Sequence, residues 1–397
     1  MINVIGLDVS KASVSLCLLT KRPENVRDFY YKCKFEKLPA SKIGITRLQE
    51  IRPDVALFEP TGVNYSRLWL EHLTKLGCEI RLVGHKELKN YRSHHLALPD
   101  KDDDADSLAL ACYYFDYCQS PQRFVRIRTP VASRLRQLVL RLQHLSRTQN
   151  PIINRIRQDL AWQFPEVALV DSHRGVSNAV PLLWGWIAGE RKSPKYDRIY
   201  KETIGVGINN AVIYHAQRIC SLEREEVEIE DEISSLLSLP EFKPYLEVFD
   251  LFKFGSRTQS VLLSQIFPFD NYLENKQPII IIRPGRFSKG ETKRHLSERR
   301  FLKTLGLAPS EYSSGDIKRQ KVSGGSSLCR KQLWLWLFTS VEIRSRRSTK
   351  ILRTLGEQVD TEKASGKPIQ LVRSRACAKA AKLLFRELVQ AFCGEKC

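Results

Sequence analysis

The order of apolar segments in the first 120 residues is the feature that most constrains the fold. Short runs rich in β-branched residues and bounded by turn residues predict strands, whereas apolar residues recurring every three or four positions predict helices. The predicted strands cover residues 2–8, 13–19, 28–35, 55–58 and 79–83. The predicted helices cover residues 41–50, a segment around Leu68, Leu70 and Leu73, and residues 103–117. This region is therefore expected to fold as an α/β domain that begins with an antiparallel meander.

Three strands followed by alternating helices and strands is the order of an RNase H-like domain, whose first and fourth strands are neighbours. Asp8 ends the first predicted strand, and Glu59 directly follows the fourth. In such a sheet the two carboxylates meet at the strand ends. Paired carboxylates of this kind bind divalent metal ions.

A second group of acids, within Lys101 to Asp106, opens the last helix of this region. Asp103 and Asp106 are three positions apart and so share one face of the helix. Asp102 and Asp106 are four apart and also share a face, so Asp102 remains an alternative to Asp103. Hard oxygen ligands suit Mg²⁺ or Mn²⁺, and a pair of such ions can hold the attacking and leaving oxygens of a phosphoryl transfer.

Beyond this domain the pattern changes to a helical period. Over residues 131–164 the leucines follow a 3-4-3 spacing, at Leu135, Leu138, Leu142 and Leu145. A second run comprises Ile219, Leu222, Ile229, Ile233 and Leu236, with Glu226 at the skipped position. The two runs predict a helical coiled-coil middle, with packing inside a helical bundle as the alternative. We expect the acidic run 223–232 to be a solvated helix face and residues 165–206 to be an irregular insertion.

The remainder of the chain predicts a mainly α domain. An apolar run over 277–285 is compatible with a strand, and the basic stretch 286–300 is expected to be an exposed insertion. Two helices are predicted over 328–343 and 376–392. The sequence thus predicts three domains, over residues 1–125, 126–240 with its insertion 165–206, and 241–397.

The charge of the chain is strongly basic and unevenly distributed. Its 64 Lys and Arg against 44 Asp and Glu give a formal net charge of +20. Residues 283–353 hold 18 Lys and Arg against five acids, and residues 121–160 hold nine Arg against one Asp. Surfaces of this kind suit phosphate backbones, so the expected partner is a nucleic acid.

The cysteines and apolar runs bound the cellular location. The chain has 10 cysteines without a C-x-x-C pair, which favours reduced, buried thiols in a cytoplasmic protein over a zinc or redox motif. The first residues show no secretion signal, and no apolar run approaches the length needed to span a bilayer. We therefore expect a cytoplasmic, nucleoid-associated protein with no membrane partner.

A candidate nucleophile lies in the C-terminal region. Ser313 and Ser314 precede Gly315 in a loop that is followed by Lys318 and Arg319. A serine flanked by cations can attack a phosphodiester, with the basic residues stabilising the developing charge. The histidines show no spacing diagnostic of a Ser-His-Asp hydrolase.

Taken together, these residues resemble the DEDD transposases of bacterial insertion sequences, relatives of the Piv-type DNA invertases. The motifs occur at both ends of the chain and in the order of the family. They are Ile5-Gly6-Leu7-Asp8-Val9-Ser10-Lys11, Phe58-Glu59-Pro60-Thr61-Gly62, Lys101 to Asp106, Gly306-Leu307-Ala308-Pro309 with Tyr312-Ser313-Ser314-Gly315, and Gly366-Lys367-Pro368.

This resemblance implies a RuvC-like domain whose four acids bind Mg²⁺, a coiled-coil linker and a C-terminal transposase domain with a serine nucleophile. Matched by motif, the acids are Asp8, Glu59, Asp103 and Asp106, and the nucleophile is Ser314, with Ser313 as the alternative. The family further implies a covalent phosphoserine intermediate with donor and target DNA, a structured guide RNA, and an active site shared between subunits of a dimer or tetramer.

Two other functions remain possible from the sequence alone. A RuvC-like, structure-selective nuclease would use metal-activated water in place of a serine. A degenerate element-encoded protein would bind nucleic acid without cutting it. Replacing Ser314 by alanine separates a serine recombinase from a water-using nuclease.

Overall fold

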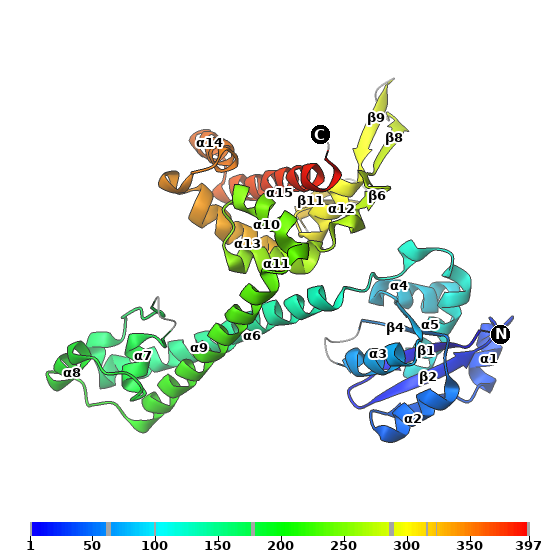
Figure 1. The fold of residues 1–397 in the computed structure, drawn as a ribbon, viewed down its shortest axis with the longest axis horizontal. Coiled ribbons are helices and arrows are strands. Elements are labelled where there is room, and N and C mark those ends of the chain that lie inside the picture. The colour runs from blue at the N-terminus through cyan, green and yellow to red at the C-terminus, as the bar shows by residue number, and fades with distance from the viewer. Residues whose placement is uncertain are drawn as a thin grey trace. The chain divides into compact units, whose positions relative to one another are not determined.

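The computed structural model describes residues 2–60, 65–98, 101–175, 179–285, 290–314, 317–322 and 324–394, with the backbone alone over 310–321. Its contacts divide the chain into two compact units, Met1–Thr129 and Pro130–Cys397 (Figure 1). None of the helices in the described part of the chain is long and apolar enough to cross a membrane.

The first unit is built on a mixed five-stranded sheet with the strand order β3-β2-β1-β4-β5. Strand β2 is antiparallel to both β1 and β3, whereas β4 is parallel to both β1 and β5. The first and fourth strands are therefore neighbours at the centre of the sheet. The strands are β1 (Val4–Val9), β2 (Ser13–Leu19), β3 (Glu36–Pro39), β4 (Val55–Phe58) and β5 (Glu79–Leu82).

Alternation along the strands gives this sheet two buried faces. Ile5 and Leu7 of β1 pack with helices α2 and α3 on one face, whereas Val4 packs with α5 on the other. Gly6 and Asp8 share the side of Val4 and thus face α5. The helices of the unit are α1 (Val26–Lys32), α2 (Lys42–Ile51), α3 (Tyr65–Lys75), α4 (His85–Asn90), the π-helix η1 (Tyr91–His95), α5 (Asp103–Tyr117) and the 3₁₀ turn η2 (Pro121–Arg123).

The predicted strand over 28–35 is wrong, because most of that segment is helix α1 and the third strand is β3. Aromatic residues at three successive positions favour a strand by local propensity. The Asn25 side chain instead accepts a hydrogen bond from Asp28 N at 3.0 Å and caps the helix. Phe29 and Tyr30 of this helix pack against the apolar cluster beneath α5. Tertiary packing and a cap therefore override the local preference.

The second unit begins with two long helices, α6 (Pro130–Gln163) and α9 (Asn210–Leu237), which pack against each other as a hairpin. Leu135, Leu138, Leu142 and Leu145 are all buried. They belong to one apolar cluster with the C-terminal helices, so this half of the hairpin is part of the C-terminal helical bundle.

The other half of the hairpin has an apolar cluster of its own, which we call the distal cluster. It joins Ile156 and Leu160 of α6 to Ala216 and Ile219 of α9, and it includes the buried Trp184. The expectation of an irregular insertion over 165–206 is therefore wrong in part, because that segment folds into elements that cover the two long helices. These are the 3₁₀ turn η3 (Pro165–Val167), α7 (Leu182–Ile187) and α8 (Pro194–Lys201).

The C-terminal bundle confirms the predicted mainly α character of this region. Its helices are α10 (Lys243–Leu251), α11 (Ser256–Ile266), α12 (Leu296–Thr304), α13 (Ser327–Trp336) with the π-helix η6 (Leu337–Val341), α14 (Lys350–Ala364) and α15 (Ile369–Cys393), with 3₁₀ turns η4 (Pro240–Phe242), η5 (Phe269–Tyr272) and η7 (Arg344–Arg346). Helix α14 is missing from the sequence prediction.

Three two-stranded ribbons accompany the bundle. They pair β6 (Leu273–Glu274) with β7 (Gln277–Pro278), β8 (Ile280–Pro284) with β9 (Glu291–His295), and β10 (Pro309–Ser314) with β11 (Ile317–Val322). The stretch 286–300, expected to be one exposed insertion, is exposed over β9 but becomes helix α12 at Leu296, where Ser297 is buried. Residues 286–289 of that stretch lie outside the described residues.

A candidate active site of four carboxylates

The two strand-end acids lie on neighbouring strands of the first unit. In the parallel register of β1 and β4, Leu7 pairs with Phe58, so Asp8 and Glu59 occupy the next positions along the two strands. Val4 and Asp8 of β1 are on one face of the sheet, as are Leu57 and Glu59 at the end of β4. Both carboxylates therefore lie at the same sheet edge, on the face covered by α5.

Helix α5 approaches this edge closely because β1 has a glycine beneath it. A Cβ atom on Gly6 would lie 1.9 Å from the carbonyl oxygen of Ser107 and 2.6 Å from the backbone nitrogen of Ala111. No side chain fits there without moving the helix. Gly6 thus permits the backbone contact that brings the first turn of α5 beside Asp8.

The acids of that first turn have different partners. The Asp102 carboxylate accepts a hydrogen bond from Ala105 N at 2.6 Å, which caps the helix, and it also accepts one from the Tyr30 hydroxyl. Asp103 instead interacts with Asp8, and this interaction contributes to the raised pKa of Asp8. Asp106 is buried on the next turn of the same face.

The electrostatics show that all four acids share one environment. Burial, followed by the charges of Asp106, Asp103 and Glu59, raises the pKa of Asp8 to about 7. Burial also raises the pKa of Asp106, even though an arginine opposes the shift. A carboxyl whose pKa is raised to about 7 by burial and by neighbouring carboxylates marks a candidate functional site.

Three basic residues, none of which the sequence had indicated, lie against the other three acids. Arg92, which is 6 % exposed, is ion paired with Asp106. His85 Nδ1 lies 2.6 Å from Glu59 Oε2, and Lys37 Nζ lies 3.8 Å from Asp103 Oδ2. In the part of the chain that the structure describes, Asp8 has no such ion pair.

No sequence signal could have found Arg92 or His85. Arg92 belongs to the π-helix η1, whose widened turn follows no amphipathic period, and His85 is the first residue of the six-residue helix α4. π-Helical turns occur frequently at functional sites. Only the tertiary structure brings these two residues to the acids.

The donor chemistry of the four carboxylates fits a hard divalent cation such as Mg²⁺ or Mn²⁺. Asp8, Glu59, Asp103 and Asp106 are the groups that could hold it, and a cation would offset both the burial and the neighbouring negative charges that raise the pKa of Asp8. Among the described residues, no three His, Cys, Asp or Glu side chains are arranged closely enough to enclose an ion.

The candidate serines belong to the second unit. In the β10–β11 ribbon, Ser313 pairs with Lys318 and Ser314 pairs with Ile317. Only the backbone is described there, and Gly315 lies outside the described residues. The choice between the two serines therefore remains a prediction.

The base of this ribbon is held firmly. Gly306 has a φ of +74°, and a Cβ on it would lie 2.6 Å from the carbonyl oxygen of Ser326. Arg330 donates to the carbonyl oxygen of Gly306 at 2.8 Å, and Ser326 N donates to Thr304 O at 3.0 Å. The chain segments entering and leaving the ribbon are thus packed backbone against backbone.

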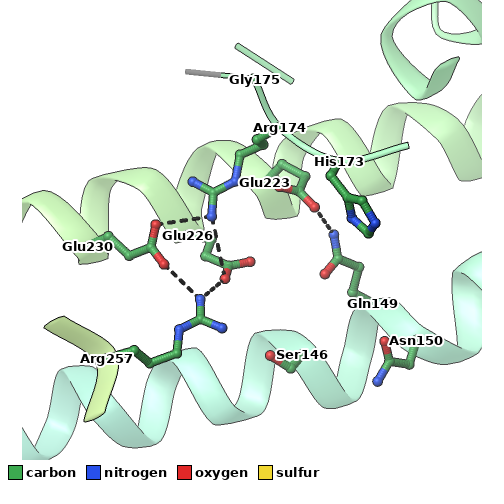
Figure 2. A pocket seen from close by; sticks show the side chains of 10 residues that line it. All are labelled: Ser146, Gln149, Asn150, His173, Arg174, Gly175, Glu223, Glu226, Glu230 and Arg257. Carbon is green, nitrogen blue, oxygen red and sulfur yellow. Dashed lines mark hydrogen bonds and ion pairs between the residues drawn. The ribbon is translucent and has the colours of Figure 1, made fainter. Parts of the chain in front are cut away.

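A second cluster of acids lies on the helical hairpin of the second unit, lining a cavity of about 490 Å³ (Figure 2). Glu226 of α9 is ion paired with Arg174 and with Arg257 of α11, and both arginines also bind Glu230. The expectation that 223–232 is a solvated helix face is therefore wrong for Glu226, which is 7 % exposed.

Glu223 completes this ion cluster. Its carboxylate accepts a hydrogen bond from the Gln149 amide of α6 and lies 2.8 Å from Arg174 Nε. Burial raises the pKa of Glu223, while the Gln149 hydrogen bond and the charge of Arg174 lower it. The cluster joins α6, α9, α11 and the loop that carries Arg174, which identifies it as a packing element.

Comparison with known proteins gives two family matches. Residues 5–165 match the family model DEDD_Tnp_IS110, described as a transposase. Residues 288–352 match a model described as a transposase of the IS116/IS110/IS902 family. The first match contains the four carboxylates, and the second contains the β10–β11 ribbon. No curated protein matches the chain.

Proposed function

The chain belongs to the IS110 family of DEDD transposases, and we propose that it cuts and exchanges DNA strands at the four carboxylates of its first unit. One observation carries this proposal: Asp8 and Glu59 end neighbouring parallel strands beside the first turn of α5, where burial and the charges of Asp106, Asp103 and Glu59 raise the pKa of Asp8 to about 7. The strand order 3-2-1-4-5 supports the assignment of a RuvC-like, RNase H-type fold to this unit.

In this proposal Asp8, Glu59, Asp103 and Asp106 would hold Mg²⁺ or Mn²⁺ where a DNA phosphate binds. A bound divalent ion would supply positive charge against the negative charge that develops on the phosphate. Arg92 and His85 orient the carboxylates of Asp106 and Glu59 by direct contact. The protonated carboxyl of Asp8 donates its hydrogen bond to Asp103, and a cation bound at this site would favour the ionised form of Asp8.

Ser314 is the proposed nucleophile, with Ser313 as the alternative. Its hydroxyl oxygen would form a bond to phosphorus, while the bond from phosphorus to the leaving DNA oxygen breaks and that oxygen takes up a proton. The phosphoserine linkage keeps the phosphate as a diester. The hydroxyl of a second DNA end can therefore attack this phosphorus, release the serine and rejoin the strand. The basic β10–β11 sequence supports this role through Lys318 and Arg319.

The remaining expectations form part of the same proposal. We propose three functional regions, the catalytic domain 1–125, a helical linker 126–240 and a transposase domain 241–397. Donor and target DNA are the substrates. A structured guide RNA selects them, and a dimer or tetramer assembles the site. The concentration of positive charge over 121–160 and 283–353 supports nucleic-acid partners of this kind.

A search for a covalent protein–DNA adduct tests the proposal. The gene is expressed with its native flanking DNA, cells are lysed in hot detergent, and protein-bound DNA is collected on filters. We expect an adduct that requires Asp8 and one of the two serines, and that is therefore absent from Asp8→Asn and from either Ser314→Ala or Ser313→Ala. Asp104→Asn, in the same first turn of α5, is the matched control and should retain the adduct.

The RuvC-like nuclease that uses water is the second candidate, and it is favoured by the fact that the carboxylates form a cluster within the first unit alone. Free DNA breaks that require Asp8 but neither serine would establish that function. DNA breaks of normal yield from Asp8→Asn would overturn both candidates.

A further inference from the structure

The β8–β9 ribbon is an exposed element with no role in the site described above. Every residue of its two strands is exposed except Ile281, which is half-buried. Figure 1 shows the ribbon projecting from the helices of the second unit beside α12 and α15. An isolated two-stranded ribbon is only marginally stable in water, so an extended one without a covering element needs either a firm base or a partner.

The ribbon has a firm base. Ser297 of α12 is 1 % exposed, and its hydroxyl donates to Tyr272 O and accepts from Ile279 N at 2.8 Å. Leu296 N donates to Ile279 O at 2.9 Å. These hydrogen bonds fix the direction in which the two strands leave the bundle, as is needed for an element that binds a partner in one orientation.

The two faces of the ribbon combine cations with apolar side chains. The register pairs Ile280 with His295 and Ile282 with Lys293, which places these four side chains on one face. Ile280 is 47 % exposed and Ile282 is 55 % exposed. The opposite face pairs Ile281 with Arg294 and Arg283 with Thr292.

The cations of the ribbon differ from those of α6 in one decisive respect. Arg134 and Arg141 of α6 form ion pairs with Glu232 and Glu225 of α9, each at 2.5 Å. Arg283, Lys293 and Arg294 have no carboxylate within ion-pair distance anywhere in the described parts of the chain. The charge of α6 is partly used in holding the hairpin together, whereas the charge of the ribbon remains available to an anionic partner.

We propose that the β8–β9 ribbon enters the major groove of duplex DNA, where Lys293 and Arg294 contact phosphates and Ile280 and Ile282 contact thymine methyl groups. The proposal deepens the proposed function, since it takes DNA as the partner from there. A two-stranded ribbon fits the roughly 12 Å wide major groove of B-form DNA but not its minor groove of about 6 Å. The major groove of A-form RNA is too deep and narrow to admit it.

Binding measurements on the full chain test the proposal. The probes are a fluorescent DNA duplex, the same duplex with uracil in place of thymine, and an RNA duplex of equal length, all measured in the presence of EDTA so that no strand is cut. We expect Lys293→Ala with Arg294→Ala to lower affinity for the DNA duplex about tenfold. The slope of log affinity against log salt should decrease by about 1.8, because each lost phosphate contact contributes about 0.9.

The isoleucines give a test that is independent of charge. Ile280→Ser with Ile282→Ser is expected to lower affinity for thymine-containing DNA about threefold to tenfold without changing the salt slope. Uracil-containing DNA should bind the native chain more weakly and bind this variant no differently from thymine-containing DNA. Since these side chains are exposed, both double variants should unfold at the same temperature as the native chain.

A matched control removes two exposed cations from α8, Arg198→Ala with Lys201→Ala, and should leave affinity within about twofold of the native value. If the native chain binds DNA while both ribbon variants bind it equally well, the ribbon proposal alone is overturned. The ribbon proposal is also overturned if the ribbon variants lose affinity for the RNA duplex and not for the DNA duplex. Failure of the native chain to bind any DNA duplex would contradict both the ribbon proposal and the proposed function.

Discussion

The molecule contains two clusters of acidic side chains, which differ in how their negative charge is compensated by neighbouring cations. On the hairpin, each of Glu223, Glu226 and Glu230 is ion paired with Arg174, Arg257 or both (Figure 2). At the sheet edge, Asp8 has no ion pair among the described residues, and its pKa is raised to about 7. The acids of the hairpin cluster already have cationic partners within the protein. At the sheet edge, Asp8 lacks such a partner in the described part of the chain, and an added cation would supply one.

The largest effect is expected at Asp8. Asp8→Asn should reduce DNA strand cleavage by about a thousandfold or more while DNA binding remains, because binding depends on the Lys and Arg surfaces. The same substitution should raise the thermal unfolding temperature, since it removes a repelled charge. Cleavage assays and thermal denaturation, with Asp104→Asn as the control, measure both effects. If the Asp8→Asn protein is less stable than the native chain, the inference that the charge of Asp8 is unfavourable in the folded state is wrong.

Removing a charge from the hairpin cluster should lower stability, in contrast to the gain expected for Asp8→Asn. Glu226→Gln leaves Arg174 and Arg257 with fewer acids in a buried site and is expected to lower the free energy of unfolding by about 2–4 kcal/mol. Urea denaturation checks this, with Glu228→Gln on the same helix as the control for loss of a charge. A gain in stability would mean that this cluster also has an uncompensated excess of acid.

The dependence of stability on pH isolates the contribution of Asp8 when the native chain is compared with Asp8→Asn. Because the pKa of Asp8 is higher in the folded state than the 3.8 of an ordinary aspartate, the folded state binds more protons between about pH 4 and 7. The contribution of Asp8 to stability should therefore be largest below pH 4 and decrease as the pH rises through 7. After discounting for partial exposure, the loss is about 1–2 kcal/mol. It should vanish in Asp8→Asn, measured by urea denaturation in EDTA.

The smallest effect concerns which acid of the α5 first turn belongs to the sheet-edge cluster. Asp102→Ala removes a helix cap and the Tyr30 contact, and should cost about 1 kcal/mol of stability with only a modest loss of cleavage. Asp103→Ala should abolish cleavage at little cost in stability. The reverse pattern in paired unfolding and cleavage assays would assign the catalytic role to Asp102.

Local patterns predicted much of the first unit. Helix α5 begins at Asp103 and ends at Tyr117, as the sequence predicts, because an acid-rich start precedes a continuous apolar run, and strand β4 matches its apolar segment. The convergence of Asp8 with Glu59 follows from strand order, which the sequence also indicates. The misassigned segment 28–35 shows where the approach fails, since aromatic residues suit strands and helices alike.

Long-range pairing accounts for what the sequence missed. Glu226 occupies a core position of its helix, yet its burial depends on Arg174 and Arg257, which are distant in sequence. Arg92 and His85 reach the acids only because η1 and α4 pack against α5. Such partners follow no local period, so they can be found only from the folded chain.

The distal cluster on the hairpin has a consequence for how this chain can be altered. The chain enters the distal half of the hairpin near Gln149 and leaves it near Glu223. The side chains of these two residues are hydrogen bonded to each other. Apart from Arg174, which reaches out to Glu226 and Glu230, the described residues between them form an excursion with its own apolar interior, bounded by a polar layer and by Pro151 inside α6. An excursion of this kind can be trimmed, lengthened or exchanged as one block, so the reach of the hairpin can change while the bundle that carries Ser314 keeps its interior.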